Sequence, residues 1–245
     1  MLSEVDWRRW PRYHRSTWSR FDLVQVFTER DAEGVGAVAP EIVERVRVNP
    51  FGLVLPDPLP PAPEASRELV FFGNFTHPPN VDAALWLGSE IMPALRARDG
   101  GTRLTVIGPA APPDVQALAA ADIRVTGRVP DLTPYLESAA VVVAPLRIGG
   151  GQRMKVLESL ARGRSVVTTS RGAEGLEHAG EPPVVVADSV DAFVQAVATL
   201  LESPRERQRL ATRGREFAAA HHSPEAYALR LERVYEEARA RRSAL

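Results

Sequence analysis

The sequence has no cysteine and only one lysine among its 245 residues. Without cysteine the chain has no disulfide, no thiolate zinc or iron–sulfur site and no cysteine nucleophile. Cysteine usage therefore does not indicate whether the protein resides in an oxidising or a reducing compartment. Lysine is scarce although positive charge is not, because 30 residues are basic and all except Lys155 are arginine. A compact ammonium differs chemically from a guanidinium, so this exception marks Lys155 as a candidate functional residue.

An excess of one charge and long hydrophobic runs are missing too. The 30 basic and 31 acidic residues leave a net charge of −1, so no global field attracts nucleic acid. The longest apolar run, residues 139–146, is far shorter than the roughly 20 residues of a membrane-spanning helix, and no signal-peptide region precedes it. We expect a cytoplasmic globular protein of one to one and a half domains.

Several motifs of nucleotide enzymes and metalloenzymes are also absent. The sequence has no G-x-x-x-x-G-K-[ST] loop, no G-x-G-x-x-G after the first strand of the α/β region, no G-x-S-x-G elbow and no D-x-D. These absences disfavour nucleotide hydrolases, simple dehydrogenases and serine hydrolases, and they predict a reaction without metal or cofactor. His221 and His222 are interpreted as a helix end, whereas His77 stays open between a loop or cap residue and a ligand contact.

Proline marks the clearest boundary, since five prolines fall within residues 56–63 and favour a stiff, extended connector. After it, valine- and isoleucine-rich runs alternate with helical patterns. The predicted strands are 69–73, 104–108, 123–127, 139–146, 165–169 and 183–187, and the predicted helices are 80–98, 113–121, 132–138, 152–162 and three more from residue 189. This alternation predicts an α/β fold with a Rossmann-like parallel sheet and helices on both faces.

Residues 1–55 carry only part of the same pattern. They contain a helix up to residue 20, strands at 23–27 and 46–49, and a helix capped by Thr28 between them. Two strands do not make an independent sheet, so we expect an incomplete α/β fragment here. The predicted organisation is this fragment at 1–55, a linker at 56–66, an α/β domain at 67–222 and a terminal helix at 223–245.

A glycine-rich loop between a strand and a helix is the strongest candidate site. Gly149, Gly150 and Gly151 let backbone N–H groups approach an anion, and the following helix adds its positive dipole end. This arrangement fits a phosphate. Arg153 falls among the apolar positions of the helix but in its first turn, so its guanidinium should reach past the helix end and needs an anionic partner.

The polar side of the same helix carries Lys155 and Glu158, about 60° apart at 100° per residue. The alternative is that these two residues and Arg162 form ordinary surface ion pairs while the glycines make a tight turn. The single lysine and the unusual position of Arg153 favour the phosphate site over this alternative.

An ordered set of short motifs suggests a family. They are Gly73-Asn74-Phe75, residues 77–83 (HPPNVDA), 106–108 (VIG), 125–131 (VTGRVPD), 143–151 (VAPLRIGGG), 155–158 (KVLE), 166–169 (VVTT) and 172–176 (GAEGL). Over residues 69–239 the chain resembles the donor-binding half of a bacterial family-4 glycosyltransferase of the GT-B fold. Any one motif is weak, but their order over about 170 residues is fairly specific.

The resemblance implies roles for individual residues. Glu158 would accept hydrogen bonds from the ribose of a nucleotide-sugar, and Arg153 and Lys155 would hold the diphosphate and stabilise its charge as it leaves. The remaining implied donor-binding residues are Gly149, Gly150, Gly151, Gly73, Asn74, Arg128, Val129 and Glu174. Arg128 and Val129 would border the base, and Gly73 and Asn74 would approach the phosphates or the sugar.

One departure affects how the donor sugar is bound. Many family members carry a second glutamate eight positions before the one that matches Glu158, and Gly150 stands there in this chain. Two alternatives remain. Either another carboxylate such as Glu174 contacts the sugar, or the backbone does.

In this family the reaction usually retains anomeric configuration, and a first domain binds the acceptor. The resemblance therefore implies a nucleotide diphosphate-sugar donor, an acceptor that is a glycan, a lipid or a small molecule, and an N-terminal half that residues 1–55 supply only in part. The alternative functions are a non-catalytic or truncated nucleotide-diphosphate-binding module that needs a partner half, and a pure interaction domain.

Residues 7–20 combine five arginines with three tryptophans and a tyrosine. Such a basic aromatic stripe could bind lipid head groups or nucleic acid, which would make the protein membrane-associated in the first case. The helical spacing of Trp7, Trp10, His14 and Trp18 instead favours packing against the rest of the N-terminal half. We expect this surface to be adhesive in the isolated chain.

Overall fold

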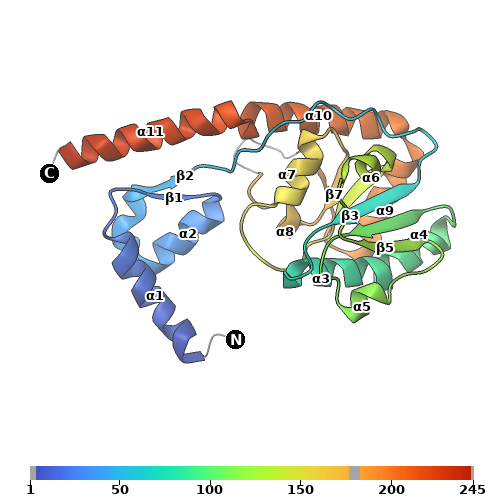
Figure 1. Cartoon of the computed structure of the whole chain (residues 1–245), viewed down its shortest axis with the longest axis horizontal. Coiled ribbons are helices and arrows are strands. Elements are labelled where there is room, and N and C mark those ends of the chain that lie inside the picture. The colour runs from blue at the N-terminus through green and yellow to red at the C-terminus, as the bar shows by residue number, and fades with distance from the viewer. Residues whose placement is uncertain (1–3, 177–182, 244–245) are drawn as a thin grey trace. The chain divides into compact units, whose positions relative to one another are not determined.

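The structure is a computed structural model that describes residues 4–176 and 183–243, with side chains from residue 9 onward in the first helix. The side chains of Trp7 and Arg8 in the basic aromatic stripe therefore lie outside the described part. The chain divides into two compact units, one formed by residues 1–54 with 221–245 and the other by residues 55–220. Each unit is described by itself (Figure 1).

The larger unit is built on a six-stranded parallel sheet. Its strands are β3 (Glu68–Phe72), β4 (Arg103–Ile107), β5 (Ile123–Gly127), β6 (Val141–Ala144), β7 (Val166–Thr168) and β8 (Val185–Val186). They lie in the order β5-β4-β3-β6-β7-β8, which becomes 3-2-1-4-5-6 when β3 is counted as the first strand. This is the order of doubly wound nucleotide-binding sheets, and it places the topological switch point between β3 and β6.

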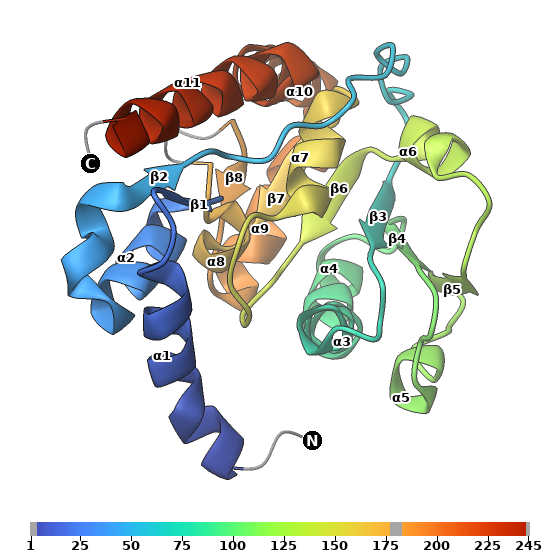
Figure 2. The same ribbon diagram turned by 60° about the vertical axis from the view of Figure 1, so that its left-hand side comes forward.

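Helices cover both faces of this sheet (Figures 1 and 2). They are α3 (Pro78–Trp86), the π-helical turn η2 (Leu87–Ile91), α4 (Met92–Arg98), α5 (Pro113–Gln116), α6 (Thr133–Ser138), α7 (Met154–Ala161), α8 (Ser170–Ala173), α9 (Val190–Glu202) and α10 (Pro204–His222). On one face α9 contacts α4 and η2, and the rings of Trp86 and Phe193 meet edge to face at 5.9 Å. On the other, α10 packs so closely on α7 that a Cβ at Gly214 would lie 2.7 Å from Leu160.

The core of the larger unit follows from its continuous apolar strands. All four residues of β6 and the last four residues of β3 and β4 are buried, as expected for parallel strands covered on both faces. The predicted fold class is confirmed.

Several local predictions differ from the structure; the predicted helix 113–121, for example, ends at Gln116 as α5. The predicted helix 80–98 begins at Pro78 and is divided by η2 into α3 and α4. The short helix α8 was not predicted, because a four-residue segment with a glycine carries no periodic pattern; Thr169 caps it by accepting from the Gly172 N–H.

The proline-rich segment before β3 is held by arginine side chains of the larger unit. Arg207 donates to the carbonyls of Pro63 at 3.4 Å and Glu64 at 3.0 Å, and Arg164 donates to that of Pro60. Proline provides no backbone donor, so its carbonyls are the available contact points. This pattern explains why an extended segment follows one defined course.

The smaller unit contains α1 (Glu4–Trp18), β1 (Val24–Val26), α2 (Glu29–Val38), the 3₁₀ helix η1 (Pro40–Arg45), β2 (Val46–Val48) and α11 (Pro224–Ser243). β1 and β2 pair in parallel, and Thr28 caps α2 in a capping box with Asp31. Its apolar cluster has only three buried residues, Val35, Ala39 and Ile42. Of the helices within the described residues, none is long and apolar enough to cross a membrane.

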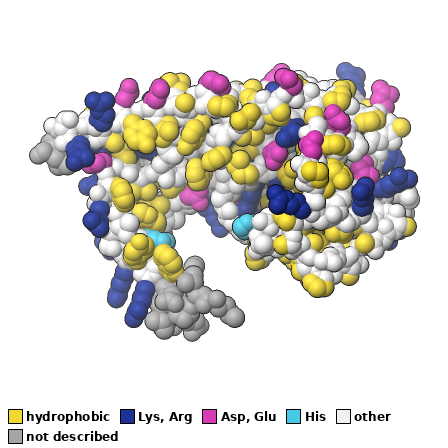
Figure 3. All heavy atoms as spheres, in the orientation of Figure 1, with side chains coloured by type: hydrophobic (Ala, Val, Ile, Leu, Met, Phe, Trp, Pro, Cys, Tyr) yellow, Lys and Arg dark blue, Asp and Glu magenta, His cyan; other side chains and the backbone are white. Residues whose placement is uncertain are grey.

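The basic aromatic stripe lies on α1, which continues through Pro11. Trp10, His14 and Trp18 stack along one side of the helix, with His14 4.7 Å from Trp18 between ring centres. Tyr13 is 59% exposed, and Figure 3 shows basic side chains beside hydrophobic ones at this end of the unit. The basic aromatic stripe is thus exposed on α1, and what binds to it stays a prediction.

Candidate functional site

The candidate site is formed by two loops at the switch point of the sheet. One follows β3 and leads through Gly73 and Asn74 into α3; the other follows β6 and leads through residues 145–153 into α7. β3 and β6 are hydrogen-bonded neighbours, so their carboxyl ends bring the two loops to the same edge. In open α/β sheets this edge is where ligands bind.

The glycines of the second loop have backbone conformations that favour glycine. Gly149 has a φ of +95° and Gly151 a φ of +79°, both in the left-handed region. A Cβ at Gly149 would also lie 2.9 Å from the Pro79 side chain at the start of α3. The loop therefore approaches the start of α3 more closely than a side chain would allow.

An arginine at the start of this loop anchors it to α3. Arg147 donates two parallel hydrogen bonds to Asp82, from Nε at 3.0 Å and from a terminal nitrogen at 2.6 Å. The carboxylate partner raises the pKa of Arg147, and the guanidinium lies 4.9 Å from the centre of the Trp86 ring. This anchor was not predicted from the sequence, although both residues lie within the family-like motifs.

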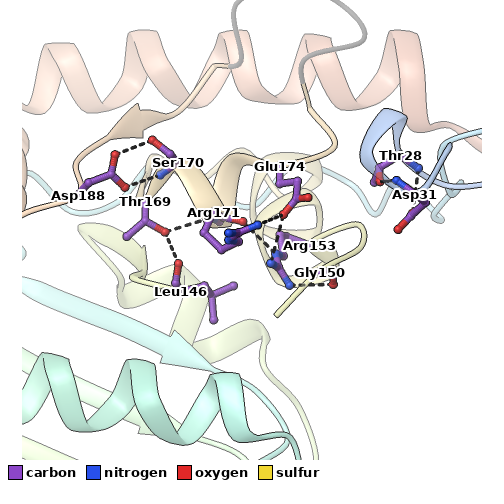
Figure 4. Close-up of polar contacts among 11 residues, drawn as sticks. Thr28, Asp31, Leu146, Gly150, Arg153, Thr169, Ser170, Arg171, Glu174 and Asp188 are labelled. Atoms are coloured by element: carbon purple, nitrogen blue, oxygen red, sulfur yellow. Dashed lines mark hydrogen bonds and ion pairs between the residues drawn. The ribbon is translucent and has the colours of Figure 1, made fainter. Parts of the chain in front are cut away.

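Arg153 is the residue just before α7, and its guanidinium is buried, with 8% of the residue exposed. It donates to the carbonyls of Arg171 and Gly150, both at 3.0 Å, and lies 3.6 Å from a carboxylate oxygen of Glu174 (Figure 4). The anionic partner that its position requires is therefore supplied by the chain itself.

Glu174 follows α8 and is buried beside Arg153 and Arg171. Its carboxylate lies 3.4 Å from the Arg171 guanidinium, and Figure 4 shows both arginines directed toward it. Glu174 is thus next to the glycine-rich loop, where the sequence predicts a sugar contact, and it is held there by two cations. Whether it contacts a sugar stays a prediction.

Lys155 lies on the first turn of α7 in surroundings quite different from those of Arg153. Its ammonium donates to Oδ1 of Asn80 and lies 4.9 Å from the centre of the Phe71 ring. Burial, together with the nearby positive charge of Arg153, lowers the pKa of Lys155 to about 7. Lys155 is thus one of the few groups here that change charge near neutral pH.

The Asn80 side chain connects Lys155 to the other loop. Its amide Nδ2 donates to the main-chain carbonyl of Asn74 at 2.6 Å, while Oδ1 accepts from Lys155. Gly73 packs against the same amide, since a Cβ there would lie 2.8 Å from it. Asn80 lies in a family-like motif, yet no role was predicted for it. A polar residue in the first turn of an otherwise apolar helix is the signal that could have identified it.

Glu158 lies one turn after Lys155 and remains partly exposed. Arg162, four residues later on the same helix, lies 3.3 Å from its carboxylate. The ordinary ion pair that the alternative interpretation predicts is therefore present for Glu158, whereas Lys155 instead bonds to the Asn80 amide. The interpretation as ordinary surface ion pairs therefore describes Glu158 but not Lys155.

Arg128 and Val129 follow β5, which is separated from β3 by β4. Arg128 is exposed, and none of the described contacts joins it to the two central loops. The same loop ends in Asp131, whose pKa is lowered by hydrogen bonds from Thr133 and, to a smaller extent, by the charge of Arg162, which follows α7. That Arg128 and Val129 border the base stays a prediction.

His77 is exposed at the position that precedes α3, and it makes no side-chain cap there. In the ranges 4–176 and 183–243, no three of His, Asp and Glu gather in a way that could hold a metal ion. Independence from metal and cofactor stays a prediction about the reaction.

Comparison with known proteins places these features in a family. The family model described as glycosyl transferases group 1 matches residues 66–203, which is more than half of the chain. No curated protein sequence matches significantly.

Solved structures share the fold at low sequence identity. TarM of S. aureus has a TM-score of 0.77 at 12% identity over 91% of this chain and 45% of TarM. A glycosyltransferase of Rickettsia africae has 0.75 at 13% over 97% and 68%, and Anabaena HepE, solved with UDP and glucose, has 0.72 at 12% over 96% and 67%. The chain spans about half the length of the first of these.

The matched residues contain the whole six-stranded sheet, both loops at its switch point and the helices that follow them. The fold is that of GT-B glycosyltransferases, as the motifs predict, and the chain belongs to the family of group 1 glycosyl transferases.

Proposed function

We propose that this chain binds a nucleotide diphosphate-sugar and transfers the sugar to an acceptor hydroxyl, without a metal ion and with retention of configuration. The observation that supports it best is the meeting of the β3 and β6 loops at the switch point. There, Lys155 and Arg153 place two basic groups beside three glycines, within a family whose members transfer sugars.

In the proposed reaction the acceptor oxygen bonds to C1 of the sugar as the bond from C1 to the diphosphate oxygen breaks. The acceptor proton passes to the departing diphosphate, whose negative charge grows during this step. Lys155 and Arg153 stabilise that charge, and the glycine-rich loop brings backbone N–H groups to it. No covalent intermediate with the chain is required.

The other donor contacts follow the positions of the remaining residues. Glu158 accepts hydrogen bonds from the two ribose hydroxyls. To do so, its carboxylate must either release Arg162 or bind Arg162 and the ribose together. Gly73 and Asn74 approach the phosphates by backbone, and Arg128 with Val129 borders the base. The HepE structure contains UDP, which makes uridine the first base to test.

Calorimetric titration of the full chain with UDP, GDP and ADP, with and without magnesium, tests the donor site. We expect micromolar binding of one nucleotide, equal in both conditions and lost in Glu158→Ala. Binding that needs magnesium contradicts the metal-independent reaction. A folded chain that binds none of the three contradicts the donor site.

A second candidate is a donor-binding module without activity of its own. The family match supports it, because residues 66–203 contain the proposed donor site. Release of UDP from UDP-glucose, with and without simple acceptors, separates the candidates. Binding without any release or transfer by the full chain supports the module and contradicts independent catalysis.

The two alternatives for the donor sugar are separated by comparing UDP with UDP-glucose in Glu174→Gln. If Glu174 contacts the sugar, the variant loses affinity for UDP-glucose but not for UDP. If the backbone contacts the sugar, both affinities change equally. Glutamine keeps the size of the side chain, which limits the structural effect of removing the charge.

A further inference from the structure

The amide of Asn80 joins the loop that follows β3 to the first turn of α7 through a side chain. Asn80 is the third residue of α3, after Pro78 and Pro79, and only 8% of it is exposed. A buried polar group that makes its hydrogen bonds within a site is held in one orientation.

The partners of the amide determine which of its ends faces which loop. The Asn74 carbonyl can only accept, so the Nδ2 end must face it, at 2.6 Å. Oδ1 therefore faces the other way and accepts from the Lys155 ammonium. Gly73 allows this close approach of the amide, because a Cβ there would lie 2.8 Å from it.

The surroundings of Lys155 make this acceptor important. The charged and polar groups that face its ammonium are Asn80 from α3 and Arg153 from the start of α7, with the Phe71 ring of β3 as the apolar neighbour. Arg153 repels the ammonium and burial opposes its charge, whereas the hydrogen bond to the Asn80 oxygen and the face of the Phe71 ring favour the protonated form.

We propose that Asn80 is a positioning residue, which holds the Lys155 ammonium between the two loops and thereby sets its contribution to diphosphate binding. An ammonium has three donors, and one of them is directed to Oδ1 of Asn80. The other two are left to face phosphate oxygens. This inference rests on the proposed function, because it assigns to Asn80 an effect on the same donor site.

The single lysine allows a direct test that needs no ligand. Protein grown with isotope-labelled lysine gives one lysine side-chain NMR signal, and its shift with pH follows the protonation of Lys155. Asn80→Asp places a carboxylate where the amide oxygen lies, so we expect the titration midpoint of Lys155 to rise by at least about one pH unit. An unchanged midpoint in the folded variant overturns the proposal.

Ser159→Ala is the matched control for this measurement. The Ser159 hydroxyl donates to the main-chain carbonyl of Lys155 at 2.7 Å, so its removal disturbs the same turn of α7 without touching the ammonium. We expect the midpoint to stay in place. A shift as large as that of Asn80→Asp contradicts a specific effect of Asn80.

A double-mutant cycle then tests the link to the donor, with UDP and inorganic pyrophosphate as probes. We expect Asn80→Ala to weaken binding about tenfold in the wild type and less than twofold in Lys155→Met, because the effect acts through the ammonium. An equal loss in both backgrounds shows a structural role and overturns the proposal. If Asn80→Ala does not fold, the Asn80→Asp titration decides.

The lysine titration and the binding measurements test different proposals, so each can be contradicted without the other. A lysine signal that responds to Asn80→Asp, in a wild-type chain that binds neither probe, contradicts the proposed function and supports the coupling of the two side chains. A signal that does not respond, in a chain that binds UDP normally, contradicts the coupling alone.

Discussion

The two basic side chains at the start of α7 lie in contrasting regions of one site. Arg153 is enclosed by carbonyls and by the Glu174 carboxylate, whereas Lys155 lies against an aromatic ring and a neutral amide. The charge of Arg153 faces a carboxylate inside the protein, whereas that of Lys155 faces a neutral amide and an aromatic ring. We therefore expect Arg153 to contribute to stability as well as to the proposed donor site, and Lys155 to act mainly on the ligand.

The largest effect that this contrast predicts is on stability in Arg153→Met. The change removes the buried cation beside Glu174, which keeps the more exposed Arg171, and it removes the hydrogen bonds from Arg153 to the carbonyls of Gly150 and Arg171. Removing one member of a buried pair costs about 3–5 kcal/mol. Denaturant unfolding measures the loss. Arg171→Met removes the more exposed partner of Glu174 and should cost less than about 1 kcal/mol; equal costs in the two variants contradict a structural role specific to Arg153.

The second prediction concerns turnover in Lys155→Met. This variant keeps the length of the side chain but removes the charge that faces the diphosphate, so we expect at least about a 100-fold lower kcat with the melting temperature unchanged or raised. Single-turnover transfer or donor hydrolysis measures it. An unchanged kcat removes Lys155 from the mechanism, and a large loss of stability contradicts an action mainly on the ligand.

The third prediction is a pH dependence that belongs to Lys155 alone. Its pKa is about 7 in the free site, and a bound diphosphate favours the ammonium, so binding takes up a proton above that pH. The affinity for UDP should therefore fall as the pH rises from 7 to 9, by up to about tenfold per unit. Calorimetry across this range measures it, and Lys155→Met should show no such fall.

The smallest predicted effect is that of Arg162→Ala. The pair with Glu158 is partly exposed and lies at i,i+4 on one helix, so its loss should cost less than about 0.5 kcal/mol of stability. In this variant Glu158 does not have to release Arg162 before it binds the ribose. UDP affinity should therefore stay equal or rise up to about twofold. A loss of more than tenfold indicates that Arg162 itself contacts the donor.

The sequence was sufficient for the fold of the larger unit and for the loop after β6. Strands rich in valine, interrupted by helical patterns, have few alternatives to a parallel sheet, and the three glycines before the helix of Lys155 mark this loop as the candidate site. Arg153 could be recognised as buried and in need of an anion, because its position contradicts the apolar pattern around it.

The pairing of residues across the two loops could not be predicted in the same way. Nothing in the sequence indicates that Asn80 bonds to Lys155, because their proximity depends on the strand order, which places β3 beside β6. The partner of Arg153 was equally hidden, since Glu174 follows a four-residue helix without periodic pattern. Local patterns gave the elements, and the sheet topology determined which side chains meet.

The strand order also determines at which stage of folding the candidate site can form. The hydrogen bond from Lys155 to Asn80 joins residues 75 positions apart, so it closes a long loop that contains all of β4 and β5. Closing such loops makes parallel sheets slow to fold, because the entropy is lost before the contacts form. A nascent chain that ends before α7 has the loop after β3 but no Lys155 ammonium to bond to it. If the proposed donor site is correct, nucleotide binding would report when β3 and β6 have paired, before β7 and β8 are added.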